Sequence, residues 1–547
     1  MVSMGVTPAE TPEETATKTP RETPAGADFV DVLIVGAGLS GIGAAYYLQR
    51  GHPRRSYAIV EARGASGGTW DLFRYPGVRS DSDLHTFGYR FRPWRSDVAM
   101  ADGDSILAYL RETAAAYGID RHIRYDTKVS AASWSSADAR WSVTTQDAQT
   151  GEQSVVTCSW LFCAAGYYRY DRGFSPDFAG RERFTGPVVH PQDWPADLDY
   201  AGRRVVVIGS GATAVTLVPA LTATAAHVTM VQRTPSYVLP VPTRDKLNAR
   251  LTRLLGGRRA YAITRRLNLT RQVAIWRACQ RYPEAARRVI RDINVRLLPA
   301  GYPVDVHFNP PYGPWDQRMC MVPDGDLFRA IRDGRASVVT GQVETFTENG
   351  VRLYDGGAVE ADIIVTATGM NVQAMGGIAL EVDGEPVRLP DTVAYKGTML
   401  SGVPNFSYVF GYTNASWTLR VGPLAEHFCR LLRYMDAHGF DTVRPLLADP
   451  DMPLRPLLDF DPGYIKRALG QLPRSGSRGP WRTARVYSAD VRLLRRRPGG
   501  DPELSFSAGS GGSAGSGRSA GSASTLGSAR TPARAMGEGR RSRQRSG

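Results

Sequence analysis

The sequence predicts an α/β fold with two Rossmann-like dinucleotide-binding domains, the second of which carries a helical insert. Two glycine-rich loops support this prediction, because each follows an apolar strand pattern and opens an apolar helix pattern. The loops read Gly36-Ala37-Gly38-Leu39-Ser40-Gly41 and Gly209-Ser210-Gly211-Ala212-Thr213-Ala214. In such loops glycine allows a tight turn and a close approach to a pyrophosphate, and the helix N-terminus supplies amide donors. An arginine-rich helical pattern between residues 243 and 315 predicts the insert.

The residues after the first loop select its nucleotide. The strand Asp31–Val35 precedes this loop and the helix Ile42–Leu48 follows it. The next strand, Tyr57–Val60, ends in Glu61. A carboxylate at this place accepts from a ribose 2′-hydroxyl and repels a 2′-phosphate, so the first loop suits FAD or NAD. The contacts expected from this part of the chain are Gly36, Gly38, Ser40, Gly41 and Glu61.

The residues after the second loop have the opposite chemistry. The strand Arg204–Ile208 precedes this loop, and the strand Val228–Val231 leads into Gln232, Arg233 and Thr234. A guanidinium and a hydroxyl at this place are what a 2′-phosphate needs. We therefore assign FAD to the first loop and NADPH to the second, and no metal. The contacts expected for NADPH are Gly209, Ser210, Gly211, Ala212, Thr213, Arg233 and Thr234.

Two further motifs give the chain a family resemblance. The first motif runs Gly67-Gly68-Thr69-Trp70, then Tyr75-Pro76-Gly77, and ends at Asp81. The second runs from Phe184 through His190 to Trp194-Pro195. Both resemble the fingerprints of type I Baeyer-Villiger monooxygenases. In the second motif, Trp194 stands where the sister flavin-containing monooxygenases carry tyrosine. The segments 70–77 and 90–94 look most like the ethionamide-activating monooxygenase subgroup.

The resemblance implies roles for individual residues. It makes Arg318 the active-site arginine, and it makes Asp81 the carboxylate that orients the Arg318 guanidinium. It implies that the second motif, with His190, is an interdomain linker and not an acid-base site. The residues that it adds to the expected FAD contacts are Gly68, Thr69, Trp70, Asp81 and the backbone of Val129.

The resemblance also implies a reaction. NADPH reduces FAD, the reduced flavin and O2 form a C4a-peroxyflavin, and one oxygen atom is inserted next to a ketone carbonyl to give an ester or lactone. The Arg318 guanidinium would favour the deprotonated peroxide and stabilise the oxyanion that develops. Gln317 stands where most family members carry lysine, so we expect a less strict preference for NADPH over NADH.

Three alternatives use the same features. The first is a flavin monooxygenase that oxygenates sulfur or nitrogen in sulfides (thioethers), thioamides or amines through the protonated hydroperoxide. The second is a disulfide reductase of similar fold, which is disfavoured because no C-x-x-C pair follows the first loop. The third is a non-catalytic flavin-binding or polyanion-binding scaffold, in which Arg318 and Asp81 would be idle.

The order of the motifs predicts the domain organisation. Strands are expected at Ile123–Ser130, Ser154–Thr157 and Trp160–Gly166, and later at Tyr408–Gly411. The predicted segments are a disordered tail at 1–27, the FAD domain at 28–180 and 371–505, the NADPH domain at 181–242 and 316–370, the helical insert at 243–315, and a disordered Gly/Ser/Arg tail at 506–547.

The distribution of charge and the spacing of the cysteines predict the partners and the location of the protein. The net charge of +14 is concentrated in residues 244–296, where fourteen arginines and one lysine face three acidic residues, and in the tail. Such segments favour a solvated face or contact with an anionic membrane, and no nucleic-acid partner is expected. The five cysteines have no disulfide or redox spacing, so a cytoplasmic location is expected. No run of about 18 apolar residues is present to span a bilayer.

Overall fold

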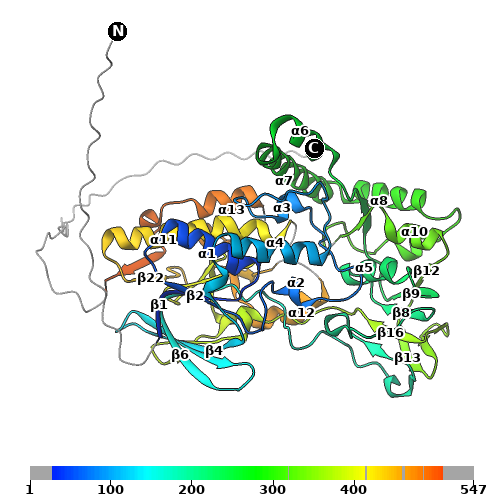
Figure 1. The fold of residues 1–547 in the computed structure, drawn as a ribbon, viewed down its shortest axis with the longest axis horizontal. Helices are drawn as coiled ribbons and strands as arrows, with labels where there is room; N and C mark the ends of the chain where they lie inside the picture. The colour runs from blue at the N-terminus through cyan, green and yellow to red at the C-terminus, as the bar shows by residue number, and fades with distance from the viewer. Residues whose placement is uncertain (1–27, 318, 413–414, 459–461, 485, 509–547) are drawn as a thin grey trace, which may run out of the picture. The chain divides into compact units, whose positions relative to one another are not determined.

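The structure, a computed structural model, describes residues 28–508 except 318, 413–414, 459–461 and 485. The tail predicted at 1–27 lies outside the described residues. A first sheet has the strand order β18-β17-β4-β5-β6-β1-β2-β3, and β21 also pairs with β6. Figure 1 labels β1, β2, β4 and β6 of this sheet. These strands are β1 (Asp28–Val35), β2 (Tyr57–Val60), β3 (Ile123–Arg124), β4 (Thr127–Ser135), β5 (Arg140–Asp147), β6 (Gln153–Cys163), β17 (Ala379–Val382), β18 (Glu385–Pro386) and β21 (Phe406–Tyr408).

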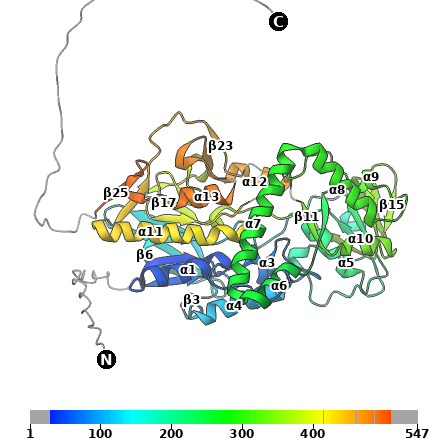
Figure 2. The same ribbon diagram turned by 90° about the horizontal axis from the view of Figure 1, so that it is seen from above.

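The centre of the first sheet is parallel and buried. Strand β1 pairs in parallel with β2 and with β6, in the register Val35↔Val60 and Val35↔Cys163. Helices α1 (Leu39–Gly51) and α11 (Val421–His438) lie side by side over one face in both views (Figures 1 and 2). Because both faces of these strands are buried in apolar cores, the strands read as continuous apolar runs rather than alternating ones.

Three strand predictions differ from the structure in their bounds. The predicted strands at 154–157 and 160–166 merge into one strand, β6, because its first half pairs with β5 and its second half with β21. This strand ends at Cys163, so residues 164–166 lie beyond it. The segment 123–130 is divided between β3 and β4 at Asp126, which has a positive φ of 52°. The strand predicted at 408–411 lies two residues earlier, as β21, because residues 406–408 pair with residues 161–163.

A second sheet is parallel throughout, in the order β12-β9-β8-β16-β7. Its strands are β7 (Val188–Val189), β8 (Arg204–Ile208), β9 (His227–Gln232), β12 (Ala336–Thr340) and β16 (Ile363–Thr366). Helices α5 (Ala212–Leu221) and α10 (Asp326–Arg332) pack together and share an apolar core with these strands. One mixed sheet with a parallel centre and one sheet that is parallel throughout, both packed against helices, confirm the predicted α/β fold with two Rossmann-like domains.

Helices fill the stretch in which the insert was predicted. Strands β10 (Val238–Val241) and β11 (Cys320–Pro323) pair with each other on either side of it. The helices between them are α6 (Lys246–Leu255), α7 (Gly257–Arg281), α8 (Pro283–Leu297) and α9 (Val304–His307). Figure 2 shows α7 as a long helix that passes α3 (Leu84–Phe87) and leads into α8.

The C-terminal part of the described chain packs back onto the first sheet. A short 3-10 helix, η6 (Trp417–Arg420), leads into α11, and the buried Arg420 donates to Asp490 Oδ2 from Nε at 3.0 Å. Strand β25 (Leu504–Ser507) pairs with β22 (Thr442–Pro445). The tail predicted from residue 506 is therefore wrong at its start, because Phe506 and Ser507 are strand residues; its remainder from residue 509 lies outside the described residues.

Among the described residues, no helix combines the length and the apolar character that crossing a bilayer requires. All five cysteines are buried and free.

Candidate cofactor and active site

A cavity of about 590 Å³ lies at the C-terminal ends of β1 and β6, between the two glycine loops. Its volume falls within the roughly 300–1,000 Å³ that is usual for small-molecule sites. The predicted site residues that line it are Gly36, Gly38, Ser40, Glu61, Gly68, Thr69, Trp70, Asp81, Val129, Ala212 and Thr213. The structure thus brings residues of both loops and of the first fingerprint to one space.

The first loop has the close contacts that exclude side chains. Gly36 has φ +102°, and a Cβ there would lie 2.7 Å from the carbonyl oxygen of Ala164. A Cβ on Gly41, which is not among the lining residues, would lie 1.9 Å from the carbonyl oxygen of Gly36. Gly38 precedes α1 and gives it no side-chain cap, so the first amide groups of that helix are open to an anion.

Glu61 directly follows β2, lines the cavity and is held by backbone amides. Its Oε2 accepts from the N–H of Ala37 at 2.8 Å, and its Oε1 accepts from the N–H of Arg63 at 3.1 Å. Burial raises the pKa of the Glu61 carboxyl, and these two hydrogen bonds oppose that rise. The carboxylate is therefore fixed at the end of the strand, where a ribose hydroxyl can donate to it.

The first fingerprint begins as a helix start beside the first loop. A Cβ on Gly68, which has φ +56°, would lie 3.2 Å from the Cα of Gly38. Thr69 and Trp70 follow in α2 (Thr69–Leu72), and the Thr69 hydroxyl lies 3.0 Å from the hydroxyl of Tyr170. Two helix starts thus face each other across a gap that only glycine leaves open.

Asp71 holds this fingerprint in place, and sequence reasoning missed it. The carboxylate is 5% exposed and contacts three guanidinium groups. The partners are Arg63 at 2.6 Å, Arg111 at 2.7 Å and Arg74 at 3.0 Å. No motif marks this aspartate, because its partners come from separate elements.

The end of the first fingerprint packs against the second domain. Burial raises the pKa of Tyr75 to about 12, while its hydrogen bond with the Thr213 side chain opposes that rise. Arg79 Nη1 lies 2.5 Å from Asp326 Oδ2, at the start of α10. Asp81 lines the cavity, and its Oδ1 accepts from the Ser82 hydroxyl at 3.4 Å. The fingerprint is therefore a contact between domains as well as part of the cavity wall.

The second loop repeats the geometry of the first. Gly209 has φ +140°, and a Cβ there would lie 2.3 Å from the carbonyl oxygen of Ala367. This matches the first loop, where a Cβ on Gly36 would lie against the carbonyl oxygen of Ala164. The Ser210 hydroxyl donates to the carbonyl oxygen of Thr234 at 2.9 Å. No heavy atom lies within 4 Å of the Cβ position of Gly211 among the described residues.

The outer part of the second site lies apart from the cavity. Ala212 and Thr213 line the cavity, whereas Gly209, Ser210, Gly211, Arg233 and Thr234 do not. The Arg233 side chain is exposed and Thr234 is half-buried. Arg318, the predicted active-site arginine, lies outside the described residues, between Gln317 and β11.

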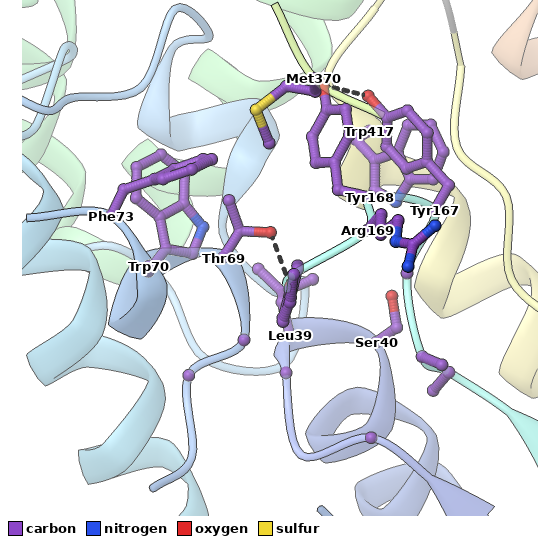
Figure 3. Close-up of a pocket in the computed structure, with 18 of the residues that line it drawn as sticks. Leu39, Ser40, Thr69, Trp70, Phe73, Tyr167, Tyr168, Arg169, Met370 and Trp417 are labelled. Atoms are coloured by element: carbon purple, nitrogen blue, oxygen red, sulfur yellow. Dashed lines mark hydrogen bonds between the residues drawn. The ribbon is translucent and has the colours of Figure 1, made fainter. Parts of the chain in front are cut away.

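An aromatic wall, which the sequence motifs did not predict, closes another side of the cavity (Figure 3). The rings of Tyr167 and Trp417 stack with centroids 4.2 Å apart and an interplanar angle of 14°. The Tyr167 hydroxyl donates to the Tyr168 hydroxyl at 2.6 Å. Figure 3 shows Met370 above this group and Trp70 on the opposite side of the space. The wall offers polarisable contacts to a bound molecule.

The second fingerprint connects the cavity with the second domain. His190 Nδ1 accepts from the N–H of Gln192 at 3.1 Å, so Nε2 donates to the carbonyl oxygen of Gly369 at 3.1 Å. Burial lowers the pKa of His190. Gln192 Nε2 donates to the carbonyl oxygen of Tyr170 at 2.9 Å, next to the aromatic wall. The side chains of His190 and Gln192 thus form hydrogen bonds with the backbone on both sides of the linker.

Comparisons with known proteins agree with this geometry. Residues 34–98 match the model of an NAD(P)-binding Rossmann-like domain, and residues 98–374 match the flavin-binding monooxygenase-like model. The FAD-containing monooxygenase EthA of Mycobacterium tuberculosis is 53% identical over 481 residues, which cover 88% of this chain and 98% of that protein.

Solved structures share the fold. An oxidised steroid monooxygenase bound to NADP aligns with a TM-score of 0.68 at 22% identity, over 88% of this chain and 100% of that chain. OTEMO in complex with FAD and NADP aligns with a TM-score of 0.68 at 21% identity, over 89% of this chain and 100% of that chain.

Together with these relatives, the fold and the cavity define a dinucleotide-dependent oxidoreductase with two Rossmann-like domains. The chain belongs to the flavin-binding monooxygenase-like family, which confirms the resemblance found in its fingerprints. It is accordingly an enzyme that uses O2 and a small-molecule substrate.

Proposed function

We propose that this enzyme uses FAD and NADPH to insert one oxygen atom of O2 next to a ketone carbonyl, giving an ester or a lactone. The observation that carries the proposal is a single cavity lined by the first glycine loop, by Asp81 and by Thr213 of the second loop. A flavin on the first loop and a nicotinamide on the second would meet in that space. The cofactors named for the steroid monooxygenase and OTEMO structures support the same pair.

The residues around the first loop fit FAD. The gap between Gly38 and Gly68 would accept a pyrophosphate, because side chains at either glycine would fill it. The open amides of α1 would donate to the phosphate oxygens, and Glu61 would accept from a ribose hydroxyl. Val129 lines the cavity and would contact the adenine. When bound, FAD would supply the electron transfer and oxygen activation that side chains cannot.

The second loop fits NADPH. The open space at Gly211 and the amides at the start of α5 suit a second pyrophosphate. The exposed guanidinium of Arg233 and the Thr234 hydroxyl would bind the 2′-phosphate. Gln317 supplies no second cation for that phosphate, so we propose a weaker preference for NADPH over NADH than a lysine there would give.

We assign the catalytic role to Arg318, with Asp81 as the residue that positions it. Gln317 precedes Arg318, and Met321, three residues further along, lines the cavity. A guanidinium beside the substrate carbonyl would stabilise the negative charge that develops on the carbonyl oxygen. Asp81, a cavity-lining carboxylate, would accept from that guanidinium and fix its direction.

The substitution Arg318→Ala tests the function. Ester formation from a panel of cyclic and linear ketones should fall by about 10²- to 10³-fold, as removal of one charge-stabilising donor typically does. FAD content and the anaerobic reduction of the flavin by NADPH should stay near wild type, because neither depends on that charge. The adjacent Gln317→Ala variant is the control and should keep ester formation. Ester production by Arg318→Ala at the wild-type rate would exclude the assignment.

Oxygen transfer to sulfur or nitrogen is the second candidate, and the aromatic wall with Met370 favours it. Tyr167, Tyr168 and Trp417 give a soft, polarisable surface that suits sulfides and thioamides. This reaction needs no stabilised carbonyl oxyanion. Sulfoxide formation that survives in Arg318→Ala while ester formation is lost would assign sulfur oxygenation to the same cavity.

We also propose that the enzyme works in the cytoplasm, in peripheral contact with an anionic membrane. The five free and buried cysteines suit a reducing compartment. The positive charge of residues 244–296 suits an anionic surface.

A further inference from the structure

Helices α6 and α7, with the glycine turn between them, form a surface that the proposed reaction does not use. We call residues 246–281 the basic hairpin. It contains one lysine and nine arginines and no aspartate or glutamate. In Figure 1 it lies at the top of the view, above α3.

The arginines of the basic hairpin are open to an external partner. Those with exposed side chains are Arg250, Arg253, Arg258, Arg259, Arg266, Arg271, Arg277 and Arg281. None of these forms an ion pair within the described part of the chain, whereas Arg244 just before the hairpin pairs with Asp97 at 2.8 Å. After the hairpin, Arg291 pairs with Asp305 at 2.6 Å. The hairpin therefore carries uncompensated positive charge.

Apolar side chains are exposed among these arginines. Leu254, beside the turn, is 79% exposed, and Leu247 on the same helix is 49% exposed. Other exposed apolar side chains of the hairpin are Leu255, Ile263, Leu267 and Ile275. Single exposed leucines are common, but several exposed aliphatic side chains on two packed helices would suit contact with an apolar partner.

Three of these arginines share the outer face of α7 with one exposed apolar side chain. Arg259, Ile263, Arg266 and Arg277 follow one another at spacings of four, three and eleven residues, which keep to one side of a helix. The other side of α7 is buried, with Ala260, Tyr261, Thr264 and Cys279 facing the body of the protein.

The basic hairpin is anchored firmly to the body. The buried Arg265 donates from Nη1 to the carbonyl oxygens of His85 at 2.7 Å and Gly88 at 2.8 Å, at the end of α3. Gln272 Nε2 donates to Asp83 Oδ2 at 2.7 Å, at the start of α3. Phe87 of α3 lines the cavity. The hairpin is thus a fixed surface, one short helix away from the cavity.

We propose that the basic hairpin docks onto an anionic lipid bilayer. The arginines would pair with phosphate headgroups, and Leu254 and its apolar neighbours would enter the interfacial region, as in interfacial amphipathic helices. A nucleic acid would use the same charges but would leave the apolar side chains in water. The inference gives the proposed membrane contact its surface and does not depend on the reaction.

Co-sedimentation of the full-length, FAD-loaded enzyme with lipid vesicles tests the proposal. The enzyme should bind vesicles of phosphatidylcholine and phosphatidylglycerol in equal parts, bind pure phosphatidylcholine weakly, and bind less as salt rises. The variant R259Q/R266Q/R277Q should bind the anionic vesicles at least about tenfold more weakly. Leu254→Ser should weaken binding in high salt as well as low salt, because its contribution is apolar.

Matched controls use exposed residues elsewhere. The triple variant R54Q/R181Q/R332Q removes the same charge, and Leu446→Ser removes a leucine that is 45% exposed; both should bind as the wild type does. Turnover of a water-soluble ketone without vesicles is measured for every variant, so that failure of docking and failure of the proposed reaction are distinguished.

Three outcomes would overturn the proposal. Hairpin variants that bind anionic vesicles like the wild type would assign that binding to another segment, such as the basic C-terminal residues. Variants that lose affinity for duplex DNA or transfer RNA but keep vesicle binding would make the hairpin a nucleic-acid surface. A wild-type dimer that the hairpin variants convert to monomers, without any vesicle binding, would make it an interface between copies of this chain.

Discussion

At the scale of single residues, the cavity depends on side chains that hold its backbone in place. Asp71 of α2 is the clearest case, because its buried carboxylate pairs with the guanidinium groups of Arg63, Arg74 and Arg111. Its neighbours Thr69 and Trp70 line the cavity. The positions of Thr69 and Trp70 therefore depend on the Asp71 charge cluster. In the proposed arrangement this cluster does not itself contact a cofactor phosphate.

Asp71→Asn should lower stability by about 1–3 kcal/mol, because three charged donors lose an ionised acceptor. The affinity for FAD should fall with it, since α2 is no longer fixed. Thermal unfolding of the protein with and without FAD, and fluorescence titration with FAD, measure both effects. Asp104→Asn is the control: Asp104 lies 3.8 Å from Arg74 but is 92% exposed, so its loss should change neither quantity measurably.

Gly77 sets how closely the first fingerprint approaches the second domain. It has φ +75°, and a Cβ there would lie 2.7 Å from Ala220 Cβ and 3.0 Å from the carbonyl oxygen of Thr216, both in α5. Gly77→Ala should cost about 1–2 kcal/mol in backbone strain and about 1–3 kcal/mol more from the clash. NADPH-driven turnover should fall further than FAD content.

The Gly202→Ala variant separates the cost of backbone strain from the cost of the clash with α5. Gly202 has φ +64°, but no described heavy atom lies within 4 Å of its Cβ position. It should show the strain in thermal unfolding and keep wild-type turnover. Equal turnover in the two variants would mean that the approach of Gly77 to α5 does not matter for the reaction.

The residues that could be predicted from the sequence are those whose role is local. Glu61 follows its loop at a fixed distance, and Gly36 sits in a turn that the chain itself forms, so a motif reveals both. Asp71, Tyr170 and Trp417 act through partners far along the chain, and no local pattern marks them. Their contribution emerges only when the fold brings the segments together.

At the scale of elements, the sequence predicted strands well where burial is two-sided. Strands β2 and β8 have the predicted bounds, because apolar runs between glycine or polar residues leave little choice. The start of the C-terminal tail was missed, because β25 is defined by its pairing with β22, some sixty residues away. The sequence likewise does not predict which face of α7 is exposed, because that depends on which side of the helix packs against the body of the protein.

The linker with the second fingerprint predicts a pH dependence of stability. Burial lowers the pKa of His190 below its ordinary value of about 6.5, so between these two pKa values the unfolded chain binds more protons than the folded one. The stability supplied by the neutral ring is therefore complete above about pH 6.5 and is lost as pH falls through the lowered pKa. The pKa values of His85, His307 and His427 are lowered in the same direction.

Thermal unfolding between about pH 5 and pH 8 checks this dependence. The unfolding temperature should fall as pH drops below about 6.5, and His190→Asn should fall less steeply, because a non-titrating amide replaces the ring. His438→Asn, at an exposed position, should follow the wild-type curve. A wild-type profile that is flat or rises toward acid would contradict the assignment.

At the scale of the whole molecule, the pair of Arg79 and Asp326 couples the two dinucleotide-binding domains. Arg79 belongs to the first fingerprint and lines the cavity, and Asp326 begins α10 on the second sheet; their side chains are 15% and 19% exposed. Arg79→Gln and Asp326→Asn should each slow the reduction of bound flavin by NADPH, measured anaerobically by stopped flow, while FAD content stays unchanged. The double variant should be no slower than the worse single variant, giving a coupling free energy of about 0.5–3 kcal/mol.

The same cycle on Arg204 and Asp362, an ion pair at 2.8 Å within the second domain, should leave flavin reduction unaltered, because that pair crosses no boundary. Additive effects at Arg79 and Asp326 would show that the domains are aligned by packing alone.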